Sequence, residues 1–217
     1  MPTFVTGAYA RSQTGVSKLV KNTYTLLSAT LFITAGVAWE SVGLHLSGGA
    51  YLVAMIASFA MIFAVFRTRN SAMGLVSLVG FAGLQGVCLG PLISMYLRTP
   101  GGSATVATAA FLTGAVFLAL SAYVHVTKKD FSAWSGMLFA GLMVVVVSSL
   151  IGLFVSSSAY QLTVAALSAM VFSGYILFDT SRIVLGGETN YILATLQLYL
   201  DILNLFLSLL RLLSDRR

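Results

Sequence analysis

The sequence contains very few charged residues. Lysine, arginine, aspartate and glutamate together make up 8% of its 217 residues, whereas soluble domains carry about 25%. Hydrophobic residues account for 58%, and the mean hydropathy is +0.95. So few charges do not cover a water-facing surface, which excludes a soluble globular enzyme, and the apolar content excludes an intrinsically disordered chain. We predict a polytopic helical membrane protein, in which each crossing requires about 20 apolar residues.

The chain also lacks the residues that several kinds of site require. Its one cysteine, Cys88, allows no internal disulfide and no cysteine-based metal centre. The net charge of +6 comes from singly scattered basic residues, without the basic stripe or stacking-aromatic motif of a nucleic-acid-binding protein. It contains no phosphate-binding glycine loop, HExxH motif or nucleophile elbow. We therefore expect a protein that is not an enzyme, binds no nucleic acid and has no tightly bound cofactor.

Seven apolar runs, separated by short polar turns, fill most of the sequence. They cover about residues 22–44, 50–66, 72–97, 103–127, 132–155, 160–184 and 191–213. These lengths are typical of membrane-spanning helices, so we expect an all-α fold with seven transmembrane helices. The predicted organisation is a cytoplasmic N-terminal tail (1–21), a seven-helix transmembrane domain (22–213) and a C-terminal tail (214–217).

Basic residues gather in alternate connections between the runs. One side has the N-terminal tail, Arg67, Arg69, Lys128, Lys129 and Arg182, and the opposite connections have Arg98 alone. Lysine and arginine collect in cytoplasmic loops, which predicts a cytoplasmic N-terminus and a lipid bilayer around the chain. Seven crossings then place the basic C-terminal tail outside, against this rule, unless the last run is re-entrant. The sequence leaves both arrangements open.

Small and turn-forming residues predict two further local features. Gly86 and Gly90, four residues apart in the third run, allow two helix backbones to approach closely, and Pro91 directly after them is expected to kink that helix. Between the sixth and seventh runs, a Gly-Gly turn precedes Thr189 and Asn190, either of which fits the position that caps the seventh helix.

Two aspartates lie inside apolar runs, whereas the other four acidic residues lie at or beyond run ends. Asp179 is within the sixth run and Asp201 is at the middle of the seventh. An aspartate near the centre of a transmembrane helix costs about 2.5–3.5 kcal/mol on insertion scales. The short connection makes the two helices antiparallel, and at 1.5 Å per residue it places Asp179 about 10 Å and Asp201 about 16 Å deep. We therefore expect the two side chains to face each other.

Two interpretations of these aspartates remain open. A facing pair shares a proton and titrates in coupled steps, which makes it a proton-responsive element, and carboxylate oxygens are ligands that Ca²⁺ prefers. In the alternative, each aspartate has a fixed partner and only holds helices together. Arg182, three residues after Asp179 on the same helix face, and Arg67, at the end of the second run, are the candidate cationic partners.

Motifs in the C-terminal third resemble the Bax inhibitor-1 family, also called transmembrane Bax inhibitor motif proteins. The resemblance rests on Gly174-Tyr-Ile-Leu-Phe-Asp179-Thr, Gly186-Gly-Glu-Thr-Asn-Tyr-Ile192 and Leu198-Tyr-Leu-Asp201-Ile-Leu-Asn204. The second of these motifs, together with Lys21-Asn22-Thr23-Tyr24 and Lys128-Lys-Asp130, is similar to the bacterial YccA-like branch of the family.

The resemblance implies six helices around a central seventh and a pH-sensitive Ca²⁺ leak, in which Asp179 and Asp201 sense protons and bind the cation. It also implies that an arginine at the end of the second helix, Arg67 or Arg69, pairs with these aspartates in a closed state. The YccA-like branch implies a different role in the bacterial inner membrane, the modulation of the FtsH protease through the N-terminal segment. We carry forward both functions, and also a bundle without transport.

Overall fold

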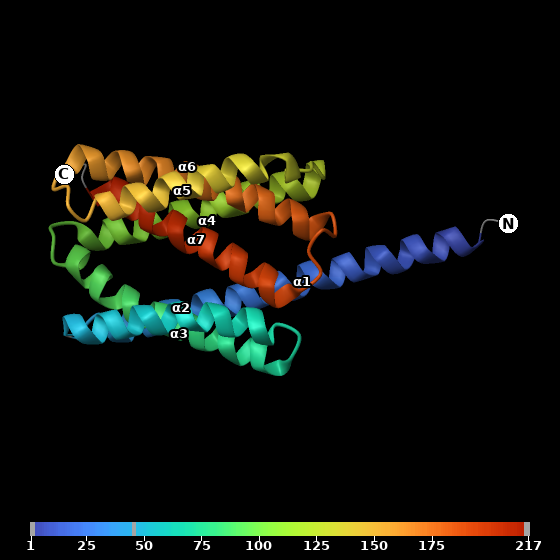
Figure 1. Ribbon diagram of the computed structural model, residues 1–217, viewed down its shortest axis with the longest axis horizontal. Helices are drawn as coiled ribbons and strands as arrows, with labels where there is room; N and C mark the ends of the chain where they lie inside the picture. The colour runs from blue at the N-terminus through green and yellow to red at the C-terminus, as the bar shows by residue number, and fades with distance from the viewer. Residues whose placement is uncertain (1–2, 45–46, 215–217) are drawn as a thin grey trace. The chain divides into compact units, whose positions relative to one another are not determined.

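The structure, a computed structural model, describes residues 3–44 and 47–214, with side chains from residue 15 onward. Within these ranges all regular structure is helical (Figure 1). The helices are α1 (Thr3–Ser41), α2 (Gly48–Thr68), α3 (Ala72–Leu97), α4 (Gly102–Thr127), the short 3-10 helix η1 (Ser132–Trp134), α5 (Ser135–Ile151), α6 (Ser158–Val184) and α7 (Tyr191–Ser214). The all-α prediction is confirmed, and apart from the start of α1 the boundaries follow the apolar runs. Residues 215–217 of the predicted C-terminal tail lie outside the described part.

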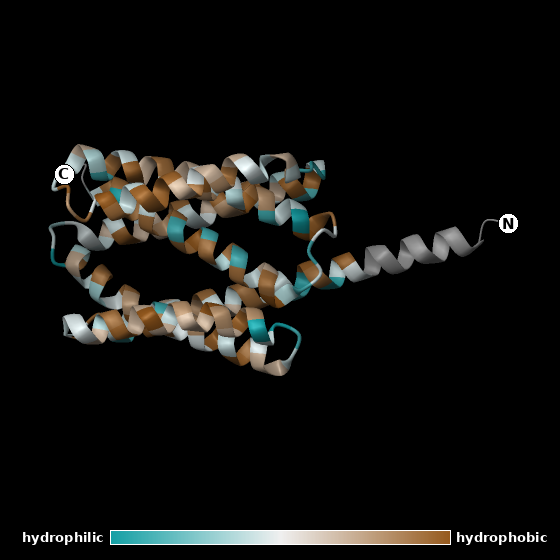
Figure 2. Ribbon diagram, in the orientation of Figure 1, coloured by the Kyte–Doolittle hydropathy of each residue, from teal (hydrophilic) through white to brown (hydrophobic). Residues whose placement is uncertain are grey.

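Six helical segments of the described chain are long and apolar enough to cross a bilayer. They are α2, α3, α4, α5 with η1, α6 and α7, and hydrophobic residues recur along their full lengths (Figure 2). Helix α1 is not among them, because its apolar half is interrupted by hydroxyl side chains, among them Thr30, Thr34 and Ser41. Six of the seven predicted crossings are therefore confirmed by length and composition, and the crossing by α1 stays a prediction.

Helix α1 is longer than one crossing requires. Its 39 residues correspond to about 58 Å at 1.5 Å per residue, roughly twice the thickness of the bilayer's hydrocarbon core. The helix begins at Thr3 and includes most of the segment that the sequence predicted to be an N-terminal tail. About half of α1 therefore lies beyond the hydrocarbon if the other half spans it.

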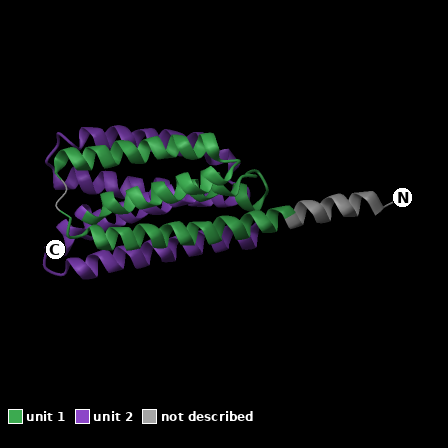
Figure 3. Cartoon of the chain, turned by 90° about the horizontal axis from the view of Figure 1, so that it is seen from below, with its two compact units in different colours: residues 1–90, 182–197 green, residues 91–181, 198–217 purple. Residues whose placement is uncertain are grey.

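The chain forms two compact units (Figure 3). The first contains residues 1–90 and 182–197, and the second contains residues 91–181 and 198–217. The dividing points fall inside helices α3, α6 and α7. In α3 the division lies between Gly90 and Pro91, where we predicted a kink, and the helix continues through Pro91 to Leu97.

In the first unit, α3 packs closely against α1 through small residues. A Cβ atom at Gly86 would lie 2.7 Å from Val37 Cβ and 2.8 Å from the carbonyl oxygen of Thr34. A Cβ at Gly90 would lie 2.7 Å from the carbonyl carbon of Ser41. These distances are far inside van der Waals contact, so the predicted small-residue packing of Gly86 and Gly90 is confirmed.

In the second unit, α6 packs against α5 through glycines of both helices. A Cβ at Gly174 of α6 would lie 2.6 Å from Leu138 Cδ2, and a Cβ at Gly141 of α5 would lie 2.9 Å from Val171 Cγ2. At each glycine, a side chain of the facing helix occupies the space that a Cβ would take, and small residues of this kind are common where helices pack in membranes. This contact fixes the position of α6, which provides one half of the candidate site.

Candidate functional site

The two aspartates singled out by the sequence lie together in the second unit. Asp179 is five residues before the end of α6, and Asp201 is ten residues after the start of α7. Each residue retains 5% of its solvent exposure. At 1.5 Å per residue, the two positions are about 8 Å and 15 Å from the helix ends that the α6–α7 turn connects. The two side chains also interact electrostatically with each other, which agrees with the predicted facing arrangement.

A hydrogen bond joins the side chains of Asp179 and Asp201. An ionised carboxylate only accepts hydrogen bonds, so a bond between two carboxyl groups requires a proton on one of them. The second carboxyl oxygen of Asp201, Oδ2, is buried and has no hydrogen-bond partner. Buried polar atoms of this kind normally bind a protein group, a water or an ion. One carboxyl oxygen of the pair is therefore buried without a hydrogen bond in the described part of the protein.

Tyr175 is a member of this site that the sequence reasoning did not assign. It lies one helical turn before Asp179 and interacts electrostatically with both Asp179 and Asp201. Its spacing of four residues from Asp179 is the signal that could have identified it, because residues i and i+4 share one face of a helix. A phenol beside two carboxyl groups offers a further hydroxyl that both donates and accepts hydrogen bonds.

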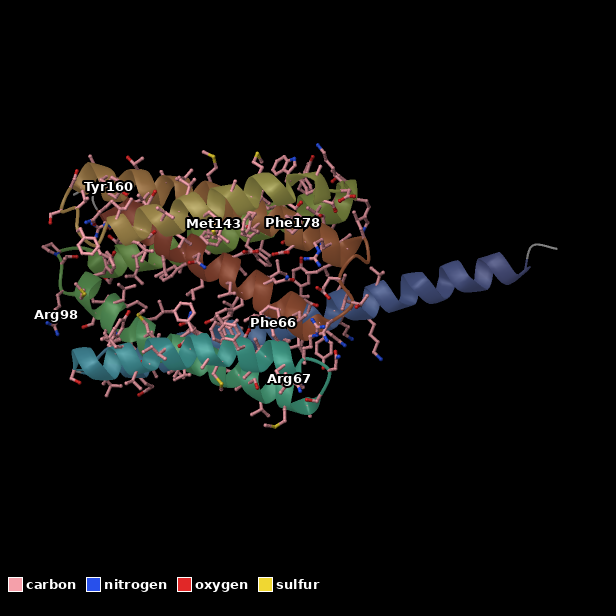
Figure 4. All side chains as sticks on the ribbon, viewed as in Figure 1. Phe66, Arg67, Arg98, Met143, Tyr160 and Phe178 are labelled. Atoms are coloured by element: carbon pink, nitrogen blue, oxygen red, sulfur yellow. The ribbon has the colours of Figure 1, made fainter. Side chains whose placement is uncertain are left out.

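The arginines proposed as partners of the aspartates lie in the first unit. Arg67 is exposed in the last turn of α2 (Figure 4), and Arg69, also exposed, is the C-cap residue that directly follows this helix. The aspartate pair belongs to the second unit. An ion pair of Arg67 or Arg69 with Asp179 or Asp201 therefore stays a prediction.

The third candidate arginine, Arg182, has an acidic neighbour in the α6–α7 turn. Its Nη2 atom lies 3.5 Å from Glu188 Oε2. The other carboxyl oxygen of Glu188 accepts hydrogen bonds from the backbone N–H groups of Thr189 and Asn190, at 2.8 Å and 2.9 Å. Glu188 therefore organises the turn from which α7 begins.

Asn190, one of the two residues predicted for this position, caps the N-terminus of α7. Its side-chain oxygen accepts hydrogen bonds from the backbone N–H groups of Ile192 and Leu193. Its side-chain nitrogen donates to the carbonyl oxygen of Arg69 and to Asn70 Oδ1, both at 2.9 Å. The same residue therefore starts α7 and attaches it to the α2–α3 connection within the first unit. This second role could not be predicted from the residue pattern alone.

The two aspartates are the acidic part of the site. Among the residues with described side chains, no group of three or more histidine, cysteine, aspartate or glutamate residues could hold a metal ion. Ca²⁺ takes six to eight oxygen ligands, some of which are commonly backbone carbonyls or waters. Asp179 and Asp201 alone therefore supply too few oxygens for a tight calcium site, and cation binding by this pair stays a prediction.

Comparison with known proteins supports the family resemblance that the sequence motifs indicate. A family model described as "Inhibitor of apoptosis-promoting Bax1" matches residues 16–217. A membrane protein of Vibrio cholerae is 49% identical over 199 residues, which cover 91% of this chain and 89% of the relative. The protein named "Modulator of FtsH protease YccA" in Escherichia coli strain K12 is 39% identical over 197 residues, 91% of this chain and 90% of the relative.

A second Escherichia coli strain, CFT073, has a relative named "Inner membrane protein YccA", with the same identity and coverage. These similarities confirm the predicted resemblance, and they confirm the prediction of a membrane protein that is not an enzyme. Because the family model extends over nearly the whole chain and the relatives are well above 30% identical along nine-tenths of it, the chain belongs to the Bax inhibitor-1 family.

Proposed function

We propose that this protein is a proton-gated cation leak of the bacterial inner membrane, with Ca²⁺ as the conducted ion and seven crossings, the seventh of them central. The observation that carries the proposal is the hydrogen-bonded pair of Asp179 and Asp201, which lie about 8 Å and 15 Å along α6 and α7 from the helix ends that their turn connects. Acidic side chains at such depth are expensive. Their retention in a chain with so few charges favours a role in ion chemistry.

The proposed gating follows from the charge of the pair. At high pH the pair carries more negative charge and attracts a cation, either an arginine of the α2 end or Ca²⁺. At low pH both attractions weaken because the carboxyl groups become neutral. With Arg67 or Arg69 as the partner in the closed state, protonation releases that arginine, and the leak opens as pH falls. Arg182, beside the α6–α7 turn, is the third candidate for this pairing.

The test is Ca²⁺ flux into liposomes that contain the purified protein, measured as a function of pH. We expect Asp179→Asn and Asp201→Asn to lose the flux or its pH dependence. Asp130→Asn is the matched control, because Asp130 is an exposed aspartate in the α4–η1 connection, and this variant should behave as the wild type. Unchanged flux and unchanged pH response in both variants of the pair would exclude the sensor role.

We propose modulation of the FtsH protease as a second function, because a relative that is 39% identical over 91% of this chain bears that name. The length of α1 is consistent with it, since the helix extends far enough to present residues outside the bilayer. Deletion of residues 1–16 should change the turnover of FtsH substrates in cells, whereas Asp201→Asn should not if the two functions are separate. Turnover that is the same with the deletion, and with the whole protein removed, would rule this function out.

A further inference from the structure

Polar side chains recur along one face of α6 and one face of α7 in the second unit. In α7 they follow one another at intervals of three or four residues, and in α6 at intervals of seven and then four. Both patterns keep residues on a single face of a helix with 3.6 residues per turn. We name this set the polar seam: Gln161, Ser168, Tyr175, Asp179, Asp201, Asn204, Ser208 and Arg211.

The two polar faces meet each other along the length of the seam. Beyond the hydrogen-bonded aspartates, Ser208 Oγ lies 2.8 Å from Ser168 Oγ. Towards the end of α7, the guanidinium group of Arg211 donates a hydrogen bond to Gln161 Oε1. Residue numbers rise along α7 as they fall along α6, so the contacts belong to one antiparallel interface. The ten residues from Asp201 to Arg211 correspond to about 15 Å along the helix.

Between the aspartates and the two serines, the seam has polar groups with spare capacity for hydrogen bonds. Asn204 and Tyr175 are partly exposed there, and the Asn204 side-chain nitrogen donates to the carbonyl oxygen of Leu200, at 2.7 Å. This leaves the side-chain oxygen of Asn204 as an acceptor. At the inner end, Oδ2 of Asp201 is buried without a partner. A water needs two to four polar partners to occupy a buried position, and these groups supply them.

We infer that the polar seam admits water to Asp179 and Asp201 from the end at which α7 finishes, and that the contact between Arg211 and Gln161 closes its mouth. This end of α6, near Tyr160 (Figure 4), is opposite to the α6–α7 turn. Protons then reach the pair by successive transfers, in which each water or hydroxyl accepts one proton and releases another, and the last is bound by a carboxylate. The titratable or charged groups along this path are Arg211 at the mouth and Tyr175 beside the pair.

This inference rests on the proposed function in one respect, the role of the pair as a proton sensor. The access route itself is a property of the protein that does not require a leak. Its test therefore measures access directly, and not flux. The chain is suited to such a test, because Cys88→Ala removes its single cysteine.

The first experiment places single cysteines in the Cys88→Ala protein in liposomes and measures their labelling by membrane-impermeant thiol reagents. Asn204→Cys and Ser208→Cys probe the seam. Leu205→Cys and Leu210→Cys are controls in the same helix, where the native side chains retain 1% and 0% exposure. With Arg211→Gln added to open the mouth, we expect the seam positions to react at least tenfold faster than the controls. Equal rates at all four positions would overturn the inference.

The charge of Arg211 gives a readout that a purely structural role would not change. In water, a unit charge about 5 Å away alters the local concentration of a singly charged reagent about fourfold, in opposite directions for anions and cations. At Ser208→Cys, the ratio of anionic to cationic labelling rates should therefore fall about sixteenfold when Arg211→Gln is introduced. The same ratio before and after this substitution would show that Arg211 does not control the mouth.

A second experiment needs no cysteine and detects water itself. Hydroxyl radicals formed from water by X-rays oxidise side chains next to bound water, and Tyr175 should be oxidised in the wild type. Tyr199, with 0% exposure, is the aromatic control and should remain unmodified. An unmodified Tyr175 would overturn the route. Oxidation at Tyr175 in a protein without pH-dependent Ca²⁺ flux would support the route and count against the proposed function.

Discussion

Replacement of Gly86 by alanine should separate α3 from α1 at a position where the two helices have no room for a methyl group. The added Cβ would lie 2.7 Å from Val37 Cβ and 2.8 Å from the carbonyl oxygen of Thr34. Carbon atoms in contact are normally about 3.5–4.0 Å apart, so the helices must move apart by about 1 Å. Overpacking of this kind costs about 1–3 kcal/mol.

Alanine also stabilises a helix by about 1 kcal/mol more than glycine does. The effect of the contact must therefore be measured against another glycine-to-alanine variant. Gly83 is the matched control, because it lies in the same helix and a Cβ there meets no atom within 4 Å. Both substitutions receive the same gain in helix propensity. The difference in free energy of unfolding between Gly83→Ala and Gly86→Ala therefore isolates the contact, and we expect Gly86→Ala to be about 1–3 kcal/mol less stable.

The assay is reversible unfolding in mixed micelles, with the denaturing detergent fraction as the variable and helicity as the signal. If the substitution affects only this contact, Gly83→Ala and Gly86→Ala have the same helicity before unfolding begins. If Gly86→Ala is as stable as Gly83→Ala, α3 and α1 do not approach each other as closely as the structure indicates, and the small-residue interpretation is wrong.

Further predictions concern the turns and the aspartate pair. Asn190→Ala removes the bonds that cap α7 and those to the α2–α3 connection, and should lower the free energy of unfolding by about 1–2 kcal/mol; an effect below 0.3 kcal/mol, as a rough limit for a lost cap, would contradict the assigned bonds. Hydrogen bonds from the Ser132 side chain and backbone hold the pKa of the Asp130 carboxyl below its ordinary value. This interaction stabilises the loop at pH values above the ordinary pKa and is lost as pH falls through the lowered one; an NMR titration of Asp130 that gives an ordinary pKa would contradict it. Asp201→Asn should flatten the pH profile of Ca²⁺ flux, and Asp130→Asn should leave that profile unchanged.

Much of the fold could be predicted from the sequence because the bilayer imposes one simple rule. A spanning segment must be apolar and helical over about 20 residues, so the apolar runs located six helices to within a few residues. The start of α1 could not be predicted in this way. Its first half is polar, and polarity indicates where a chain leaves the membrane without indicating whether its helix stops there.

The aspartate pair could be predicted for a related reason, since a charge inside an apolar run is conspicuous. The remaining polar seam was missed because serine, asparagine and glutamine are common and inexpensive in membrane helices. Ser168 and Gln161 gain meaning only when Ser208 and Arg211 are known to lie opposite to them. The spacing of seven residues in α6 was visible in the sequence, but it does not indicate which helix that face contacts.

The uneven burial of the helices has a consequence for how this family varies. In the apolar part of α7, 67% of the residues are buried inside the protein, whereas the same fraction is 11% in α2 and in the segment of η1 and α5. When one aliphatic residue replaces another on α2 or α5, the new side chain contacts the lipid acyl chains as the old one did. Most such changes should therefore leave the stability of the protein unchanged. On α7 the same change alters contacts with other side chains, so drift among relatives, and adaptation to thicker or thinner bilayers, should be concentrated in α2 and α5.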